Sequence, residues 1–196
     1  MSQELLNLLA ARRGHFKFES GHHGDLWLDL DLLFLQPQKL QPFIDALADR
    51  LEKYNPAAIC GPLVGGALIA HSIAAKLGIE FYYTEPVNIA QPGTLYSVKY
   101  RLPKNFESHV SGKKIVVVDD VINAGSAVRA TLEELSLQEA RPVAIGCLIL
   151  LGTLAQDYFA KEHIAVESLE ALSNNLWMPG DCPLCHSNLP LDEVSR

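Results

Sequence analysis

Two adjacent carboxylates, Asp119 and Asp120, end an apolar run and precede a stretch of small residues in "IVVVDDVINAGSAVRA" (residues 115–130). This pattern is typical of a buried strand that ends at a binding edge, because ligands of open α/β sheets bind at the carboxyl ends of the strands. The loop "NAGSA" (residues 123–127) offers main-chain N–H groups at the start of a helix, a favourable place for a phosphate. Carboxylates repel a phosphate, so we expect the acids to hold sugar hydroxyls or a metal. The stretch therefore predicts a pocket for a phosphorylated sugar.

Adjacent acids after a strand also occur as helix caps or as solvated side chains, and the loop alone does not decide between these interpretations. The segment is neither a Walker A loop nor a GxGxxG loop. Over a dozen residues, however, "IVVVDDVINAGSA" resembles the phosphoribosyl pyrophosphate (PRPP) motif of type I phosphoribosyltransferases, and most of all that of the orotate enzymes. The resemblance implies that Asp119 and Asp120 hold the ribose 2- and 3-hydroxyls. It also implies that the 5-phosphate is surrounded by Asn123, Ala124, Gly125, Ser126 and Ala127.

A second glycine-rich loop, "GPLVGG" (residues 61–66), lies between a short apolar stretch and a small-residue helix. Its glycines permit close approach of the backbone to a ligand, although a tight turn needed only for packing gives the same pattern. Upstream of the acid pair, it resembles the pyrophosphate loop of the same family. The resemblance implies further PRPP contacts from Pro62, Leu63, Val64, Gly65 and Gly66. Val64 replaces a Lys of some orotate enzymes, so main-chain amides would do more of the binding.

The N-terminal segment "FKFESGHHGDLWLD" (residues 16–29) resembles the orotate-binding segment of the family, with Trp27 in the expected frame. The resemblance assigns base binding to Ser20, Gly21, His22 and Asp29. The inserted "HHGDL" departs from the family pattern. His22 and its neighbour His23 either contact an acidic base or, as is common for two histidines in a turn, are simply exposed.

Orotate enzymes carry basic groups on a loop that corresponds to residues 85–111, where they stabilise charge on the departing pyrophosphate. This chain has "YSVKYRLPKNFESH" there, with basic residues at Lys99, Arg101, Lys104 and His109. Lys99 and Arg101 are two residues apart, so they share one face of a strand, and we assign them catalytic roles. The alternative is a solvated hairpin.

The C-terminal "CPLCH" (residues 182–186) has the spacing of half a zinc site, with Cys182 and Cys185 as ligands. His186 or residues of a second subunit would complete it. The alternatives are reduced thiols or c-type haem attachment, and the latter requires an export signal. Cys60 and Cys147 lie in apolar strands, so we expect them in the core.

The elements that must position these residues follow from hydrophobic spacing. Apolar strands at residues 57–60, 79–84, 113–119 and 142–151, separated by helices at 67–78 and 126–140, predict an α/β fold. We expect a central, mostly parallel sheet flanked by helices, the type I phosphoribosyltransferase fold. The predicted single domain comprises a small N-terminal hood (residues 1–36), an α/β core (37–172) and an irregular tail (173–196). Helices are also predicted at residues 3–12 and 38–54, with short strands between them.

The chain has 196 residues and a formal net charge of -7, which argues against a nucleic-acid-binding protein. We found neither a signal peptide nor an apolar run of about 18 residues, so we expect a cytoplasmic protein without a membrane anchor. The resemblance implies Mg²⁺-assisted transfer of ribose 5-phosphate from PRPP to a base, with orotate in pyrimidine biosynthesis as the first hypothesis. Transfer to another base and a PRPP-binding regulator without transferase activity remain as alternatives. The family analogy also implies a homodimer.

Overall fold

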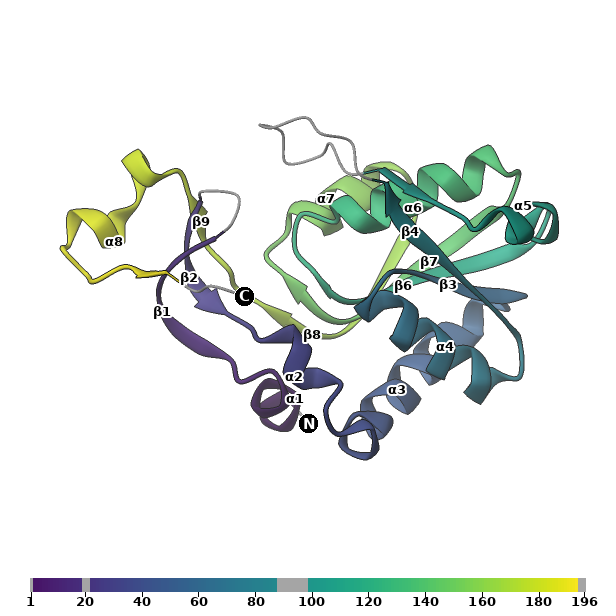
Figure 1. Ribbon diagram of the computed structural model, residues 1–196, viewed down its shortest axis with the longest axis horizontal. Helices are drawn as coiled ribbons and strands as arrows, with labels where there is room; N and C mark the ends of the chain where they lie inside the picture. Colours follow the sequence, from purple (N-terminus) through teal and green to yellow (C-terminus); the bar gives the residue numbers. More distant parts are fainter. Residues whose placement is uncertain (1, 19–21, 88–98, 194–196) are drawn as a thin grey trace. The chain divides into compact units, whose positions relative to one another are not determined.

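A computed structural model describes residues 2–18, 22–87 and 99–193 of the chain (Figure 1). The chain divides into two compact units. We call residues 41–171 the α/β unit, and residues 1–40 together with 172–196 the terminal unit. Among the described helices, none combines the length and apolar character needed to cross a membrane.

The α/β unit is built on a six-stranded sheet. In spatial order its strands are β5 (Lys99–Arg101), β4 (Glu80–Val87), β3 (Ala58–Pro62), β6 (Lys114–Ile122), β7 (Arg141–Leu151) and β8 (Ala165–Leu172). β4, β3, β6 and β7 are parallel, and β5 is antiparallel to β4. Its helical segments are α3 (Pro37–Leu51, whose first turn belongs to the terminal unit), η1 (Glu52–Tyr54), α4 (Gly65–Leu77), α5 (Lys104–Val110), α6 (Ser126–Leu137) and α7 (Leu154–Lys161). The mostly parallel sheet confirms the predicted fold class.

The order of the strands reverses between β3 and β6. From this pair the chain proceeds outward through α4 to β4 and, in the other direction, through α6 to β7. Because such crossovers are right-handed, α4 and α6 cover opposite faces of the sheet, as Figure 1 shows. A reversal of this kind opens a crevice at the carboxyl ends of the two strands, and ligands of α/β proteins bind there. Both predicted phosphate loops begin at these two ends.

The core explains why these strands are apolar. Every residue of β3 is buried, and the first half of β6 is buried from Ile115 to Val118. Helix α4 ends at Gly78, which has a left-handed φ of 67°, as the predicted C-cap requires. Cys60 and Cys147 are fully buried, which confirms their expected place in the core.

Several elements were not predicted. Helix α7 and strand β8 lie between the last predicted strand and the tail, and α5 lies in the segment expected to be a loop. α7 is short and buries only Ala155 and Phe159, one turn apart, so its helical signal is weak. The segment 85–106 was expected to be a loop or an irregular hairpin. β4 continues to Val87 and pairs with β5, so the described part is a hairpin.

The terminal unit has its own four-stranded sheet. In spatial order its strands are β10 (Asp192–Glu193), β1 (Arg12–Lys17), β2 (His23–Trp27) and β9 (Leu176–Trp177). Its helical segments are α1 (Ser2–Leu8), α2 (Leu30–Leu33), η2 (Pro179–Asp181) and α8 (Pro183–His186). The short strands predicted between the two N-terminal helices are confirmed as β1 and β2, which are antiparallel. The tail, expected to be irregular, instead returns to this hairpin and adds a short strand at each edge.

Candidate active site

The acid pair lies on β6, at the edge where the strand order reverses. Asp120 is buried with 7% of its surface exposed, and Asp119 is half-buried. The Oδ1 atom of Asp119 accepts a hydrogen bond of 3.0 Å from the main-chain N–H of Asp120. The Oδ1 atom of Asp120 accepts one of 2.7 Å from the N–H of Val121. Each carboxylate is therefore held by the neighbouring amide of its own strand.

The loop of residues 62–66 lies directly against these carboxylates. A Cβ atom added at Gly65 would lie 2.0 Å from Oδ2 of Asp120, and one at Gly66 would lie 2.8 Å from Oδ1 of Asp119. Real Cβ contacts are longer than this, so only glycine fits at either position. The peptide bond between Leu63 and Val64 is cis. The structure thus brings the predicted pyrophosphate loop and the acid pair into contact, from two neighbouring strands.

The loop of residues 123–127 leads from the end of β6 into α6. Gly125 precedes the helix with a φ of 76°, a left-handed conformation that favours glycine. A side chain there would also approach the ring of Phe159 at 3.2 Å. α6 begins at Ser126, so the first N–H groups of a 12-residue helix open onto this loop. Such an end attracts an anion, as the sequence predicted.

Electrostatics distinguish Asp119 from an ordinary surface acid. Burial, together with the charge of Asp120, raises the pKa of the Asp119 carboxyl well above its usual range. Burial raises the pKa of Tyr100 on β5, and the charge of Asp119 raises it further. Two carboxylates forced together in a desolvated crevice favour a ligand that offers hydroxyl donors or a cation.

The comparisons with known proteins agree with this geometry. Residues 33–184 match the family described as phosphoribosyl transferase domain.

The chain belongs to the phosphoribosyltransferase family. It is 30% identical over 179 residues to the orotate phosphoribosyltransferase of Desulforamulus reducens, covering 90% of this chain and 85% of that protein. It is 28% identical to the orotate phosphoribosyltransferase of Thermotoga maritima, covering 98% of this chain and 96% of that protein. The crystal structure of orotate phosphoribosyltransferase from Aeropyrum pernix shares the fold with a TM-score of 0.69 at 23% identity, covering 87% of this chain and 93% of that chain. The adenine phosphoribosyltransferase of Thermoanaerobacter pseudethanolicus has the same TM-score at 19% identity and covers 88% and 100% of the two chains.

In this phosphoribosyltransferase, Lys99 and Arg101 lie on β5, and both are exposed. They share a face of the strand, as their spacing predicts, whereas the half-buried Tyr100 between them points the other way. The neighbouring main chain is anchored, because the N–H of Leu102 donates to Glu134 on α6 at 3.3 Å. Sequence reasoning concentrated on the basic residues and missed Tyr100. Tyr100 lies between Lys99 and Arg101, but the alternation of a three-residue strand does not reveal which of its faces is buried.

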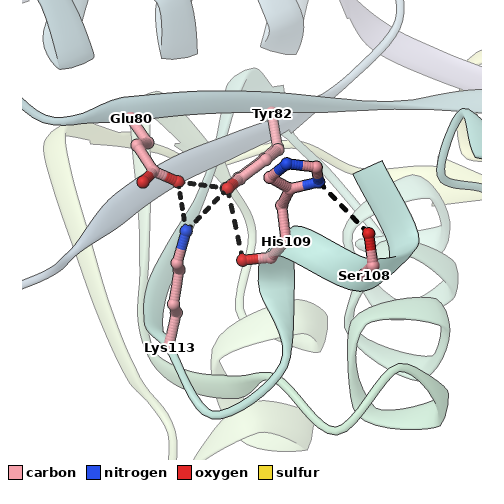
Figure 2. A network of polar contacts seen from close by, with 5 residues as sticks. All are labelled: Glu80, Tyr82, Ser108, His109 and Lys113. Atoms are coloured by element: carbon pink, nitrogen blue, oxygen red, sulfur yellow. Dashed lines mark hydrogen bonds and ion pairs between the residues drawn. The ribbon is translucent and has the colours of Figure 1, made fainter. Parts of the chain in front are cut away.

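His109 was also considered for the charge on pyrophosphate, but it lies elsewhere. It is on α5, and its main-chain carbonyl accepts a hydrogen bond of 3.4 Å from the hydroxyl of Tyr82 (Figure 2). Lys113 donates to the same hydroxyl at 3.0 Å and pairs with Glu80. Glu80 and Tyr82 lie at the start of β4, level with Ala58 and Cys60 of β3. This network therefore lies at the amino ends of the strands, opposite the acid pair, so the expectation for His109 is wrong.

The predicted base-binding residues belong to the terminal unit. Ser20 and Gly21 lie outside the described residues. The carbonyl of His22 accepts a hydrogen bond of 2.9 Å from the N–H of Phe18, and the N–H of Asp29 donates to Leu9 at 2.8 Å. The ring of Trp27 stacks on that of Phe18, with centroids 5.9 Å apart. The hairpin that bears this segment is thus fixed by its own contacts.

The two C-terminal cysteines lie beside two histidines of the β1–β2 hairpin. Cys182 and Cys185 meet His15 and His23, whose ligand atoms all lie within 4.8 Å of one another. His186, considered above as a further ligand, is exposed. His23 was expected to be exposed or to face a base, but only 6% of its surface is exposed. His15 was missed altogether, since nothing in its spacing connects it to residues 182–186.

Proposed function

We propose that this phosphoribosyltransferase transfers ribose 5-phosphate from PRPP to orotate, with release of pyrophosphate, in pyrimidine biosynthesis. The observation that carries the proposal is the contact between the acid pair and the loop of residues 62–66, beside the helix-opening loop of residues 123–127. This arrangement supplies one subsite for each part of PRPP. The names of the curated relatives support orotate as the base.

Asp119 and Asp120 would accept hydrogen bonds from the ribose 2- and 3-hydroxyls. The main-chain N–H groups of residues 123–127 would bind the 5-phosphate at the start of α6. Those of residues 64–66 would bind the pyrophosphate at the start of α4, because Pro62 has no N–H and the N–H of Leu63 donates to the carbonyl of Thr84. Two helix N-termini then face the anionic groups of one substrate. Catalysis in such a site is mostly positioning and electrostatic stabilisation of the charge that develops on the leaving group.

The acid pair also fits a divalent cation. Carboxylate oxygens are the ligands that Mg²⁺ prefers. Burial and the charge of Asp120 raise the pKa of Asp119, and a bound cation would favour its ionised form. Asp119 and Asp120 would hold Mg²⁺ together with the sugar hydroxyls. When bound, the ion would neutralise charge on the departing pyrophosphate.

Lys99 and Arg101 would approach the pyrophosphate from β5. Tyr100 would interact electrostatically with the carboxylate of Asp119. Ser20, Gly21, His22 and Asp29 would contact the base. The family analogy extends the proposal to a cytoplasmic homodimer. The inserted "HHGDL" and the altered basic segment favour a second candidate, transfer to a base other than orotate.

The decisive experiment offers the protein PRPP, Mg²⁺ and one base at a time: orotate, uracil, adenine, guanine or hypoxanthine. We expect pyrophosphate release and a nucleotide product with orotate alone. Release with a different base would replace the first candidate with the second. Absence of release with all five, from protein that binds PRPP, would indicate a PRPP-binding protein without transferase activity.

A further inference from the structure

Four side chains in the terminal unit converge on one point. His15 comes from β1, His23 from β2, and Cys182 and Cys185 from the start and middle of the α8 segment. Three of them are buried, with exposures of 3% for His15, 6% for His23 and 0% for Cys182. We propose that these residues form a structural zinc site, which is independent of the PRPP pocket.

Four of the six distances between the ligand atoms match a tetrahedral zinc site. Zinc bonds of about 2.0–2.1 Å to nitrogen and about 2.3 Å to sulfur separate tetrahedral ligands by about 3.3 Å for two nitrogens and about 3.6 Å for nitrogen and sulfur. Nε2 of His15 lies 3.1 Å from Nδ1 of His23 and 3.4 Å from Sγ of Cys182. Sγ of Cys185 lies 3.7 Å from that Nε2 and 3.2 Å from Nδ1 of His23. These four edges already have the dimensions of an occupied site.

Hydrogen bonding alone does not account for this packing. Nδ1 of His15 lies 2.9 Å from the main-chain oxygen of Leu189, which can only accept, so Nδ1 carries the proton. In the neutral ring Nε2 then has a single lone pair, yet three ligand atoms surround it at 3.1–3.7 Å. One lone pair satisfies one hydrogen bond, whereas a cation at the centre satisfies all four groups at once.

The contact with Leu189 is also what a metal-bound histidine requires. A ligating imidazole usually donates its second N–H to a carbonyl or carboxylate, which fixes its tautomer and orientation. Two thiolates and two imidazoles form a ligand set that suits Zn²⁺ and not a hard ion such as Mg²⁺. Four protein ligands leave no open position, so the site is structural and not catalytic.

The site would join segments that are far apart in the sequence. His15 and His23 hold the β1–β2 hairpin, whereas the cysteines hold the excursion between β9 and β10, each of which has only two residues. Strands this short contribute few hydrogen bonds, and small units commonly depend on a metal or disulfide for stability. The zinc ion would therefore fasten the C-terminal tail to the N-terminal hairpin.

The test begins with the metal content of the whole protein, purified without added chelator. We expect about one zinc ion per chain, as a closed site requires. Substitution by Co²⁺ should give thiolate-to-cobalt charge-transfer bands and the strong visible bands of a tetrahedral site. The spectrum is measured on the wild-type protein, so it does not depend on whether a variant folds.

Variants then assign the ligands. Cys182→Ser and Cys185→Ser should each lose the cobalt charge-transfer intensity and at least about nine-tenths of the bound zinc. His186→Ala removes the neighbouring exposed imidazole of the "CPLCH" segment. It should keep both the cobalt charge-transfer bands and the bound zinc, which makes it the matched control. The proposal is overturned if the wild-type protein binds neither metal, if it contains a Cys182–Cys185 disulfide, or if the cysteine variants retain zinc.

Discussion

The proposed PRPP pocket and the proposed zinc cluster bring residues together in different ways. The pocket combines two continuous loops that follow neighbouring parallel strands, so the fold class alone predicts that they meet. The cluster combines a hairpin with a tail, and its members Cys182 and His15 are separated by 167 positions. Motifs that lie at strand ends can therefore be located from sequence, whereas the convergence of distant single residues needs the fold itself.

The two regions also differ in what they do to stability. The pocket places two carboxylates in a desolvated crevice and raises the pKa of Asp119, which is unfavourable until a ligand binds. The cluster has the opposite effect on folding stability, because a bound metal would stabilise the unit that holds it. PRPP binding is thus proposed for the part of the chain that the acid pair destabilises, and metal-dependent stability for the terminal unit, which also bears the proposed base-binding segment.

Outside the acid pair itself, the largest kinetic effect is expected from Gly65→Ala. The added Cβ would lie 2.0 Å from Asp120, so the loop or the carboxylate must move, and a displacement of this size reduces kcat/KM about 100-fold. Steady-state kinetics with PRPP as the varied substrate measure this loss of kcat/KM. Gly78→Ala is the control, because a Cβ at Gly78 meets no atom within 4 Å. It should cost about 1 kcal/mol of stability at its left-handed φ and leave kcat/KM unchanged. Normal activity of Gly65→Ala would contradict the geometry of the pocket.

Loss of zinc should affect the base more than PRPP. His23 would be a zinc ligand, and it directly follows His22 of the proposed base-binding segment. We expect Cys185→Ser to raise KM for the base about tenfold, equivalent to about 1.4 kcal/mol, with little change in the affinity for PRPP. His186→Ala should change neither constant. An equal loss of affinity for both substrates would show that the two regions are not separable in this way.

How far the sequence could predict each region is clear from individual residues. The roles expected of Gly65, Gly66 and Gly125 depended on local pattern, and the structure places all three beside the acids or in the helix-opening turn. Tyr100 was missed because alternation along a three-residue strand is too short to reveal which side faces the pocket. His15 was missed because burial of one imidazole depends on how the tail returns, which no local spacing encodes.

The unfavourable charge of Asp119 predicts a stabilising substitution. Its pKa is raised in the folded state, so folding takes up protons and stability falls as the pH rises through that pKa. At pH values above that raised pKa, Asp119→Asn should therefore raise Tm by a few degrees, roughly 2–4 °C, and abolish activity. The gain should shrink as the pH is lowered through the raised pKa, where the native carboxyl is also neutral. Calorimetric scans over a series of pH values measure this change in Tm, and a gain in Tm that does not grow as the pH is raised would contradict the electrostatic argument.

The smallest effect is expected from Tyr100→Phe. Burial and then the charge of Asp119 raise the pKa of its hydroxyl. If this hydroxyl donates a hydrogen bond in the PRPP complex, its removal costs about 1 kcal/mol, or roughly fivefold in kcat/KM. The ring and its packing remain, so Tm should not change. Kinetics at saturating base, with PRPP varied, would detect the difference. An unchanged kcat/KM would show that Tyr100 has no part in the site.

The most direct test of the pocket is calorimetric titration of the wild-type protein and of Asp120→Asn with PRPP and Mg²⁺. Asparagine keeps an oxygen that can accept the N–H of Val121, so the strand end is preserved and only the charge is removed. The variant should keep its circular dichroism spectrum and bind PRPP at least about 100-fold more weakly, a loss of about 2.7 kcal/mol. Equal affinities of the two proteins for PRPP would contradict the assignment of the acid pair.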